Sequence, residues 1–152
     1  MPASGNTALL KECALFDIQR ASRVVAGLYN VHLREAGLSV AQFSVLRNIA
    51  ALQPVGMVRL ARALAMERTS VTRLIEPLSD QGLVRVVAAA DRRVRNLEVT
   101  ARGASRIRAA ERYWRAAQQE LYDTLGRAQW MAMRNALRRT VRRVKERHER
   151  AE

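Results

Sequence analysis

The chain has 152 residues, of which 49% are apolar, and this is enough for one domain with a hydrophobic core. It carries 27 Lys and Arg against 14 Asp and Glu, a formal charge of +13, which favours a polyanionic partner. The single cysteine, Cys13, excludes an internal disulfide framework. With only two histidines, the chain lacks a usual zinc ligand set, so we expect no metal or other cofactor.

The first residues, MPASGNT, lack the basic start and apolar core of a secretory signal. No segment approaches the roughly 18 uncharged apolar residues of a membrane-spanning helix. We therefore expect a soluble, cytoplasmic protein. Composition alone does not distinguish DNA from RNA or from an anionic membrane surface.

The first half of the chain predicts two amphipathic helices before residue 57. Apolar residues recur at steps of three and four up to Gly37, which ends the first helix. Ser39 is the predicted N-cap of the second, and Gln53, Pro54 and Gly56 close it. The predicted apolar positions are Leu10, Ala14, Ile18, Ala21, Val25 and Leu28 in the first helix, then Val40, Phe43, Leu46 and Ala50 in the second.

Residues 57–84 predict two shorter helices. Leu60, Ala61 and Leu64 form the apolar face of the first, and a polar turn at Glu67, Arg68 and Thr69 follows it. The next helix has Val71, Leu74, Ile75 and Leu78 on one side, and Gly82 stands where its C-cap is expected. Pro77 has no N–H to donate, so we expect an irregular last turn.

After Gly82 the pattern changes to strand, turn and strand, with an Asp-Arg-Arg tip at residues 91–93. The helical period then returns in two segments separated by Gly126. The apolar positions of these segments are Ile107, Ala110, Trp114, Ala117 and Leu121, followed by Trp130, Met133, Leu137, Val141 and Val144.

Two short helices joined by a turn and followed by a hairpin make a winged helix-turn-helix. The fold class is therefore predicted as mainly α, with a two-stranded β wing and long N- and C-terminal helices. The polar side of the fourth helix is expected to enter the DNA major groove, with basic residues of the wing near the backbone. The candidate DNA-binding residues here are Arg68, Thr69, Ser70, Thr72 and Arg73 of the helix and Arg92 and Arg95 of the wing.

These segments together resemble the MarR-type transcriptional regulators over nearly the whole chain. GLSVAQFSVLRNIA is similar to the family's second helix, LARALAMERTSVTRLIEPLSDQGLV to its helix-turn-helix, and DRRVRNLEVTARG to its wing. Asp91 and Arg93 match the family's wing signature, in which the arginine reaches the minor groove. The resemblance thus adds both residues to the candidate DNA-binding set.

The resemblance also implies a homodimer that reads a palindromic operator in double-stranded DNA, one half-site for each copy. Residues 1–36 and 104–152 are then expected to form a helical dimerisation region, and residues 37–103 the DNA-binding domain. The two long terminal apolar stripes favour this interpretation independently. The alternative is a monomer whose terminal helices cover its own core.

Regulation has two candidate sites in the sequence. MarR-like proteins often bind small aromatic effectors between the dimerisation helices and the DNA-binding lobe, and the residues that would line such a cleft are Tyr29, His32, Phe43, Tyr113 and Trp114. A place in the core is favoured for each of them. Cys13, in the first turns of the first helix, is a candidate peroxide sensor by resemblance to one branch of the family, but an inert packed thiol is favoured.

Other functions remain as alternatives. The chain lacks a Gly-rich phosphate loop, a nucleophile elbow and a partner that would orient His32, so we expect no enzyme. A basic RNA-binding or nucleoid-associated protein without sequence readout is the main rival. Eight basic residues lie between Arg134 and Arg150, and we interpret them as a solvated helix end whose cations suit the helix dipole, not as a DNA contact.

Overall fold

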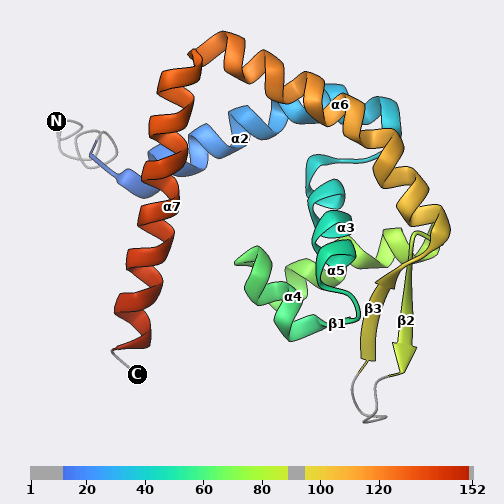
Figure 1. Cartoon of the computed structure of the whole chain (residues 1–152). Helices are drawn as coiled ribbons and strands as arrows, with labels where there is room; N and C mark the ends of the chain where they lie inside the picture. Colours follow the sequence, from blue (N-terminus) through green and yellow to red (C-terminus); the bar gives the residue numbers. More distant parts are fainter. Residues whose placement is uncertain (1–11, 89–94, 151–152) are drawn as a thin grey trace, which may run out of the picture. The chain divides into compact units, whose positions relative to one another are not determined.

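The computed structural model of the protein describes residues 12–88 and 95–150 (Figure 1). Its order of elements confirms the predicted four helices, hairpin and two helices, so the protein is mainly helical with a winged helix-turn-helix. One short strand, β1, was not predicted. In chain order the elements are α2 (Ala14–Leu33), the 3₁₀ turn η1 (Arg34–Ala36), α3 (Val40–Leu52), β1 (Val55–Gly56), α4 (Met57–Leu64), α5 (Arg68–Asp80), β2 (Val84–Ala88), β3 (Arg95–Val99), α6 (Ala101–Leu125) and α7 (Arg127–Glu149).

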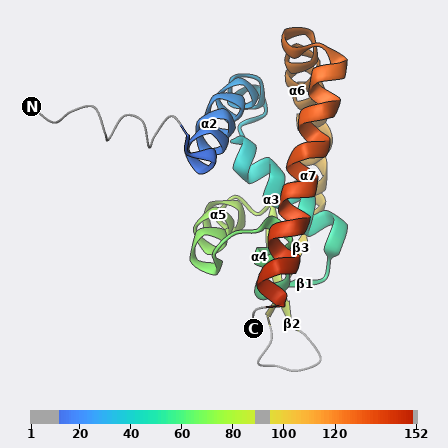
Figure 2. The same cartoon turned by 90° about the vertical axis from the view of Figure 1, so that its left-hand side faces the viewer.

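The described chain divides into two compact units within α6, the first ending at Arg115 and the second beginning at Ala116. The second unit holds the end of α6 and the whole of α7, which Figure 2 shows as one continuous helix. Gly126, with φ +75°, separates the two helices as predicted. None of the described helices combines the length and apolarity needed to cross a membrane.

The core of the first unit is built from aliphatic side chains of α2, α3, α4, α5 and the strands. Burial of this apolar surface is the main favourable contribution to folding. The largest fully buried side chains are Leu33, Val45, Leu46, Ile49, Val55, Leu60, Val71, Leu78 and Leu83.

Helix α3 begins at the predicted N-cap. The Gln42 N–H donates to the Ser39 hydroxyl (3.2 Å), and the Ser39 N–H donates to the Gln42 side chain (2.9 Å), which completes a capping box. The predicted apolar face is wrong at Ala50, which is exposed. Val45 and Ile49, four residues apart, are buried instead, so the face in contact with the core is turned away from Ala50.

The turn between α4 and α5 lies at residues 65–67, earlier than predicted. Ala65 adopts the left-handed conformation (φ 51°), and the Met66 N–H donates to the Ala61 carbonyl (3.0 Å), which closes α4. The extended Glu67 is the N-cap of α5. Arg68 is therefore the first residue of that helix and does not belong to the turn, because Ala65 already reverses the chain.

The end of α5 is regular, contrary to the prediction from Pro77. The helix continues to Asp80, and Leu78 in its last turn is fully buried. Gly82 (φ +67°) then forms the predicted cap: its N–H donates to the Ser79 carbonyl (2.8 Å), and the Leu83 N–H to the Leu78 carbonyl (2.9 Å). The missing donor of one proline does not outweigh this packing and capping.

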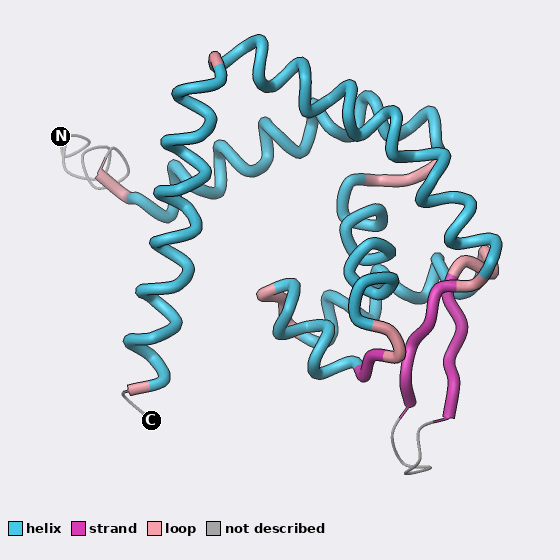
Figure 3. The backbone as a smooth tube through the Cα atoms, viewed as in Figure 1, coloured by secondary structure: helices cyan, strands magenta, loops and turns pink. Residues whose placement is uncertain are grey.

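The strands form one small antiparallel sheet in the order β1-β3-β2 (Figure 3). In β3, Leu97 pairs with Val55 of β1 on one side and with Val86 of β2 on the other. The two-stranded wing is therefore confirmed, and β1 adds a third strand at its base. A strand of two residues is too short for an alternating pattern to predict.

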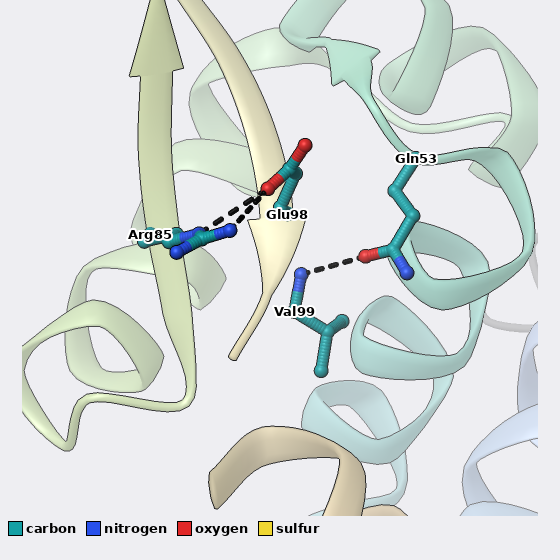
Figure 4. A network of polar contacts seen from close by, with 4 residues as sticks. All are labelled: Gln53, Arg85, Glu98 and Val99. Atoms are coloured by element: carbon teal, nitrogen blue, oxygen red, sulfur yellow. Dashed lines mark hydrogen bonds and ion pairs between the residues drawn. The ribbon is translucent and has the colours of Figure 1, made fainter. Parts of the chain in front are cut away.

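Two side-chain contacts fix the base of the wing (Figure 4). The Val99 N–H donates to the side-chain oxygen of Gln53 (2.8 Å), which ties β3 to the end of α3. Across the hairpin, Arg85 pairs with Glu98 through one oxygen at 2.8 and 3.2 Å. The pair is largely exposed, so it sets the register more than it stabilises the fold.

The Leu-x-x-Thr-x-x-Gly pattern joins the wing to α6. Leu97 is buried in the sheet, and the Thr100 hydroxyl donates to the Gly82 carbonyl (2.7 Å) while it accepts from the Gly103 N–H (3.0 Å). Thr100 thus caps α6 and holds the end of α5. A Cβ at Gly103 would overlap the Leu83 carbonyl oxygen, so only glycine fits there.

Candidate nucleic-acid interface

A basic groove opens between α4, the start of α5 and the wing. Its volume is about 960 Å³, and four arginines line it: Arg59, Arg62, Arg68 and Arg95. None of the described residues that line it is acidic. The remaining lining residues are Pro54, Gly56, Met57, Val58, Thr72, Val86, Asn96 and Leu97.

Helix geometry distributes the predicted DNA-binding residues of α5 over three rows. Arg68 and Thr72, four residues apart, line the basic groove. Thr69 and Arg73 form the next row and are exposed. Ser70 is exposed on the far side of that row. The opposite face of the helix is fixed to the core, as predicted.

The first turn of α5 is open to an anion. Its N-cap, Glu67, makes no side-chain capping hydrogen bond. The N–H groups of a helix start carry partial positive charge and bind phosphates readily. The Thr72 hydroxyl donates to the Arg68 carbonyl (3.0 Å), so it can only accept a hydrogen bond from another group. Arg68 and the helix start therefore supply the donors of this face.

Only one of the predicted wing residues falls within the described chain. Arg95, the first residue of β3, is exposed and lines the basic groove. Asp91, Arg92 and Arg93 lie outside the described residues. The groove thus joins one wing cation to the cations of the helix-turn-helix.

Arg59 and Arg62 were missed at the level of sequence. The prediction for residues 57–67 named their apolar face and polar turn but not these two arginines. Their spacing of three residues nevertheless places both on one side of α4. That side meets Arg68 only because the Ala65 turn folds α5 back against α4. The spacing of Arg59 and Arg62 could thus be predicted from the sequence, but their proximity to Arg68 could not.

Three of the five candidate effector residues come together in the first unit. Tyr29 and Phe43 are 8% and 2% exposed, and the Tyr29 and Trp114 rings are 6.5 Å apart. The guanidinium of Arg47 lies 5.8 Å from the Phe43 ring and 5.9 Å from the Trp114 ring. This arginine, four residues after Phe43, was not singled out by sequence. The Tyr29–Trp114 cluster, as we call these four residues, joins α2, α3 and α6.

The other candidates lie elsewhere. Tyr113 is half-buried, and its hydroxyl accepts from Arg112 (2.6 Å). His32 is half-buried on α2. Cys13 is a half-buried free thiol at the N-cap of α2, so it precedes the helix and does not lie in its first turns as predicted. Its backbone is extended, which starts the helix one residue later.

Comparison with known proteins places these features in a family. A sequence model of the MarR family matches residues 36–94, which hold the helix-turn-helix. The transcriptional regulator MosR of M. tuberculosis is 31% identical, with a TM-score of 0.78, and the match covers 90% of this chain and 98% of MosR. The same protein in complex with DNA is 34% identical over 89% and 98% of the two chains, again with a TM-score of 0.78.

A mutant of MarR from E. coli, complexed with operator DNA, has the same fold at 21% identity. Its TM-score is 0.79, and the match covers 87% of this chain and 96% of MarR. These relatives are transcriptional regulators, in agreement with the expectation that the protein is not an enzyme. With MosR above 30% identity over nearly its full length, and with the family's own sequence pattern matched at the helix-turn-helix, the chain belongs to the MarR family of transcriptional regulators.

Proposed function

We propose that the protein is a cytoplasmic, sequence-specific transcriptional regulator that binds a palindromic operator as a homodimer and responds to a small aromatic effector. The basic groove carries the DNA-binding part of this proposal. Among the residues that the structure describes, four arginines from three separate elements line it, and none of its lining residues is an acid. Guanidinium forks match phosphate oxygens in geometry as well as in charge.

Base reading is assigned to α5. Its Thr69 and Arg73 form an exposed row beside the groove, and an arginine in the major groove binds guanine through two hydrogen bonds. If the groove follows the phosphate backbone, the neighbouring row faces the base edges. The solved structures of MosR and of a MarR mutant in complex with DNA support this assignment by family membership.

The dimer is assigned to the terminal helices, with residues 1–36 and 104–152 as the dimerisation region and 37–103 as the DNA-binding domain. Leu137, Val141 and Val144 form an apolar stripe on α7, and each is between 43% and 53% exposed. No residue of α7 is buried within the described chain. A second copy that covers this stripe removes the cost of exposing it to water.

The effector is assigned to the Tyr29–Trp114 cluster. Arg47 and two aromatic rings offer a cation and flat apolar faces, which suit an aromatic molecule. The same side chains join α2 and α6 to α3. A molecule that binds between these side chains and moves them apart would therefore change how α2 and α6 pack against α3 of the winged-helix region.

The test is a titration of the full-length protein against the DNA upstream of its own gene and against a scrambled duplex of equal length. We expect a preference for the upstream duplex. The variant Arg62→Gln/Arg68→Gln should reduce the salt slope of binding by about 3.6, since each copy of the homodimer loses two phosphate contacts of about 0.9 each.

A matched variant, Arg20→Gln/Arg23→Gln on α2, loses the same charge from exposed positions outside the groove and should keep the slope. Equal affinity of the wild type for both duplexes would reject sequence reading in favour of a nucleoid-type protein. Tighter binding to RNA than to either duplex would favour the RNA-binding alternative.

A further inference from the structure

Helix α7 carries two rows of arginines that the proposed function does not use. Residues at steps of four share a face of a helix, so the basic residues of α7 sort onto the two sides of its apolar stripe. The rows are Arg134, Arg138 and Arg142 on one side and Arg139, Arg143 and Arg147 on the other. The arginine rows, as we call them, extend along most of the helix.

The helix dipole does not account for these rows. The basic residues in the last turn of α7 are Arg147 and His148. The influence of the dipole falls off within that turn. Because α7 runs to Glu149, Arg138 and Arg142 lie one turn or more before it. The helix dipole therefore accounts for Arg147 and leaves the other members of the rows unexplained.

The rows also destabilise an isolated helix. Like charges four residues apart repel each other, and α7 repeats this spacing along both rows. Within the part of the chain that the structure describes, Arg142 has an ion pair with Glu146 at 3.9 Å, and Arg139 and Arg143 have none. Both partners of that pair are exposed, so its contribution is small. The compensating anions are therefore to be sought outside the chain.

A phosphate backbone fits the arginine rows in spacing and in chemistry. Four residues of α-helix advance about 6 Å, so each row presents a guanidinium at that interval over roughly two turns. Duplex DNA carries one negative charge per about 1.7 Å of its axis, so an anion is available to every arginine in either row. The rows hold no Asn or Gln that would read a base edge.

We propose that the arginine rows of α7 bind the phosphate backbone of duplex DNA without reading its sequence, as a second contact surface besides the basic groove. The apolar stripe between the rows is assigned to the second copy, so the rows border that interface. In the single chain five of the six arginines are exposed, and Arg134 is half-buried. The proposal rests on DNA binding by the protein but not on the groove.

The test is the salt dependence of binding to a scrambled duplex, measured with the full chain. Arg139→Gln/Arg143→Gln should lower the slope of log K against log salt by about 3.6, because each copy of the bound homodimer loses two phosphate contacts of about 0.9 each. The fold-loss in affinity should be equal on the operator and on the scrambled duplex. Arg139→Lys/Arg143→Lys keeps both charges and should retain the slope.

Arg20→Gln/Arg23→Gln is the matched control, since it removes the same charge from exposed positions on α2. An unchanged slope in the α7 glutamine variant, or an equal change in this control, would overturn the proposal. So would a change seen with single-stranded RNA alone, or a loss of dimer mass in light scattering. If the groove variant keeps the full affinity and the salt slope of the α7 variant falls, the assignment of DNA binding to the groove is wrong, whereas the proposal for the arginine rows is supported.

Discussion

The winged-helix region and α7 use their apolar residues in opposite ways. In the first, Leu46, Ile49 and Leu78 are fully buried, a capping box starts α3, and Gly82 caps the end of α5. In α7, Leu137 and Val141 are about half exposed, and no residue is buried within the described chain. The winged-helix region satisfies its own apolar surface, whereas α7 presents a face that another molecule has to cover.

The two regions also differ in where their charges lie. The arginines of the basic groove come from three elements that the core holds together, so their arrangement is fixed by tertiary structure. The arginines of α7 repeat along a single helix, so their spacing is fixed by the backbone alone. The first arrangement suits recognition of a particular site, and the second suits a uniform polyanion.

The largest expected effect comes from placing a charge in the stripe of α7. Leu137→Lys would put a cation beside the arginine rows, with no acid at hand, and a buried unpaired charge costs about 3–5 kcal/mol. We expect light scattering to change from dimer to monomer at micromolar concentration. Leu137→Met keeps the volume and should remain dimeric. A lysine variant that stays dimeric would mean that the stripe is not the interface.

The next effect lies within the winged-helix region. Gly103→Ala would force its Cβ against the Leu83 carbonyl oxygen and to 2.7 Å from the Val99 side chain. We expect a loss of about 3 kcal/mol in the free energy of unfolding, measured in urea at one protein concentration. Gly27→Ala is the control, because an added Cβ there has nothing within 4 Å and should stabilise α2 by about 0.5–1 kcal/mol. Equal midpoints for the two variants would contradict the close approach.

The third expected effect concerns base reading by α5 in the winged-helix region. Arg73→Ala should weaken binding to the operator by roughly 1–3 kcal/mol if the side chain makes two hydrogen bonds to guanine. The scrambled duplex should lose less. A bracing ion pair with Asp91 is the alternative role of Arg73, and in that case the two duplexes lose affinity equally.

A smaller effect is expected from the cation of the wing that lines the groove. Arg95→Gln should lower the salt slope of binding by about 1.8, one contact from each copy of the homodimer, with little change in base preference, since the side chain is assigned to phosphate. Arg85→Gln, at an exposed cross-strand pair outside the groove, serves as the control. The same slope for Arg95→Gln and wild type would place the start of β3 off the DNA.

The smallest effect is expected at Cys13. A half-buried thiol at the N-cap of α2, without a second cysteine in the chain, is expected to be inert. Cys13→Ser should bind the operator as tightly as wild type, and mild peroxide should release neither protein. Release of the wild type alone would establish redox sensing and remove the priority of the aromatic effector.

Local signals in the sequence determined much of the fold. Ser39 as an N-cap, Gly82 as a C-cap and the apolar periods depend on neighbours within about four residues, so they can be interpreted without a structure. The same holds for the order of helices and hairpin, from which the winged helix-turn-helix and the reading helix were predicted. Ala50, the turn at residues 65–67 and Pro77 are exceptions. At Pro77, burial of Leu78 outweighed the local preference of the proline.

Contacts between residues far apart in the chain were decided by the tertiary structure alone. Strand β1 exists because Val55 pairs with Leu97, and two residues carry no period of their own. The basic groove exists because the Ala65 turn brings Arg62 beside Arg68, and the sheet adds Arg95. Each arginine of the groove can be seen in the sequence. Their shared surface depends on core packing between segments that are far apart in the chain. No local sequence pattern contains the distance between such segments.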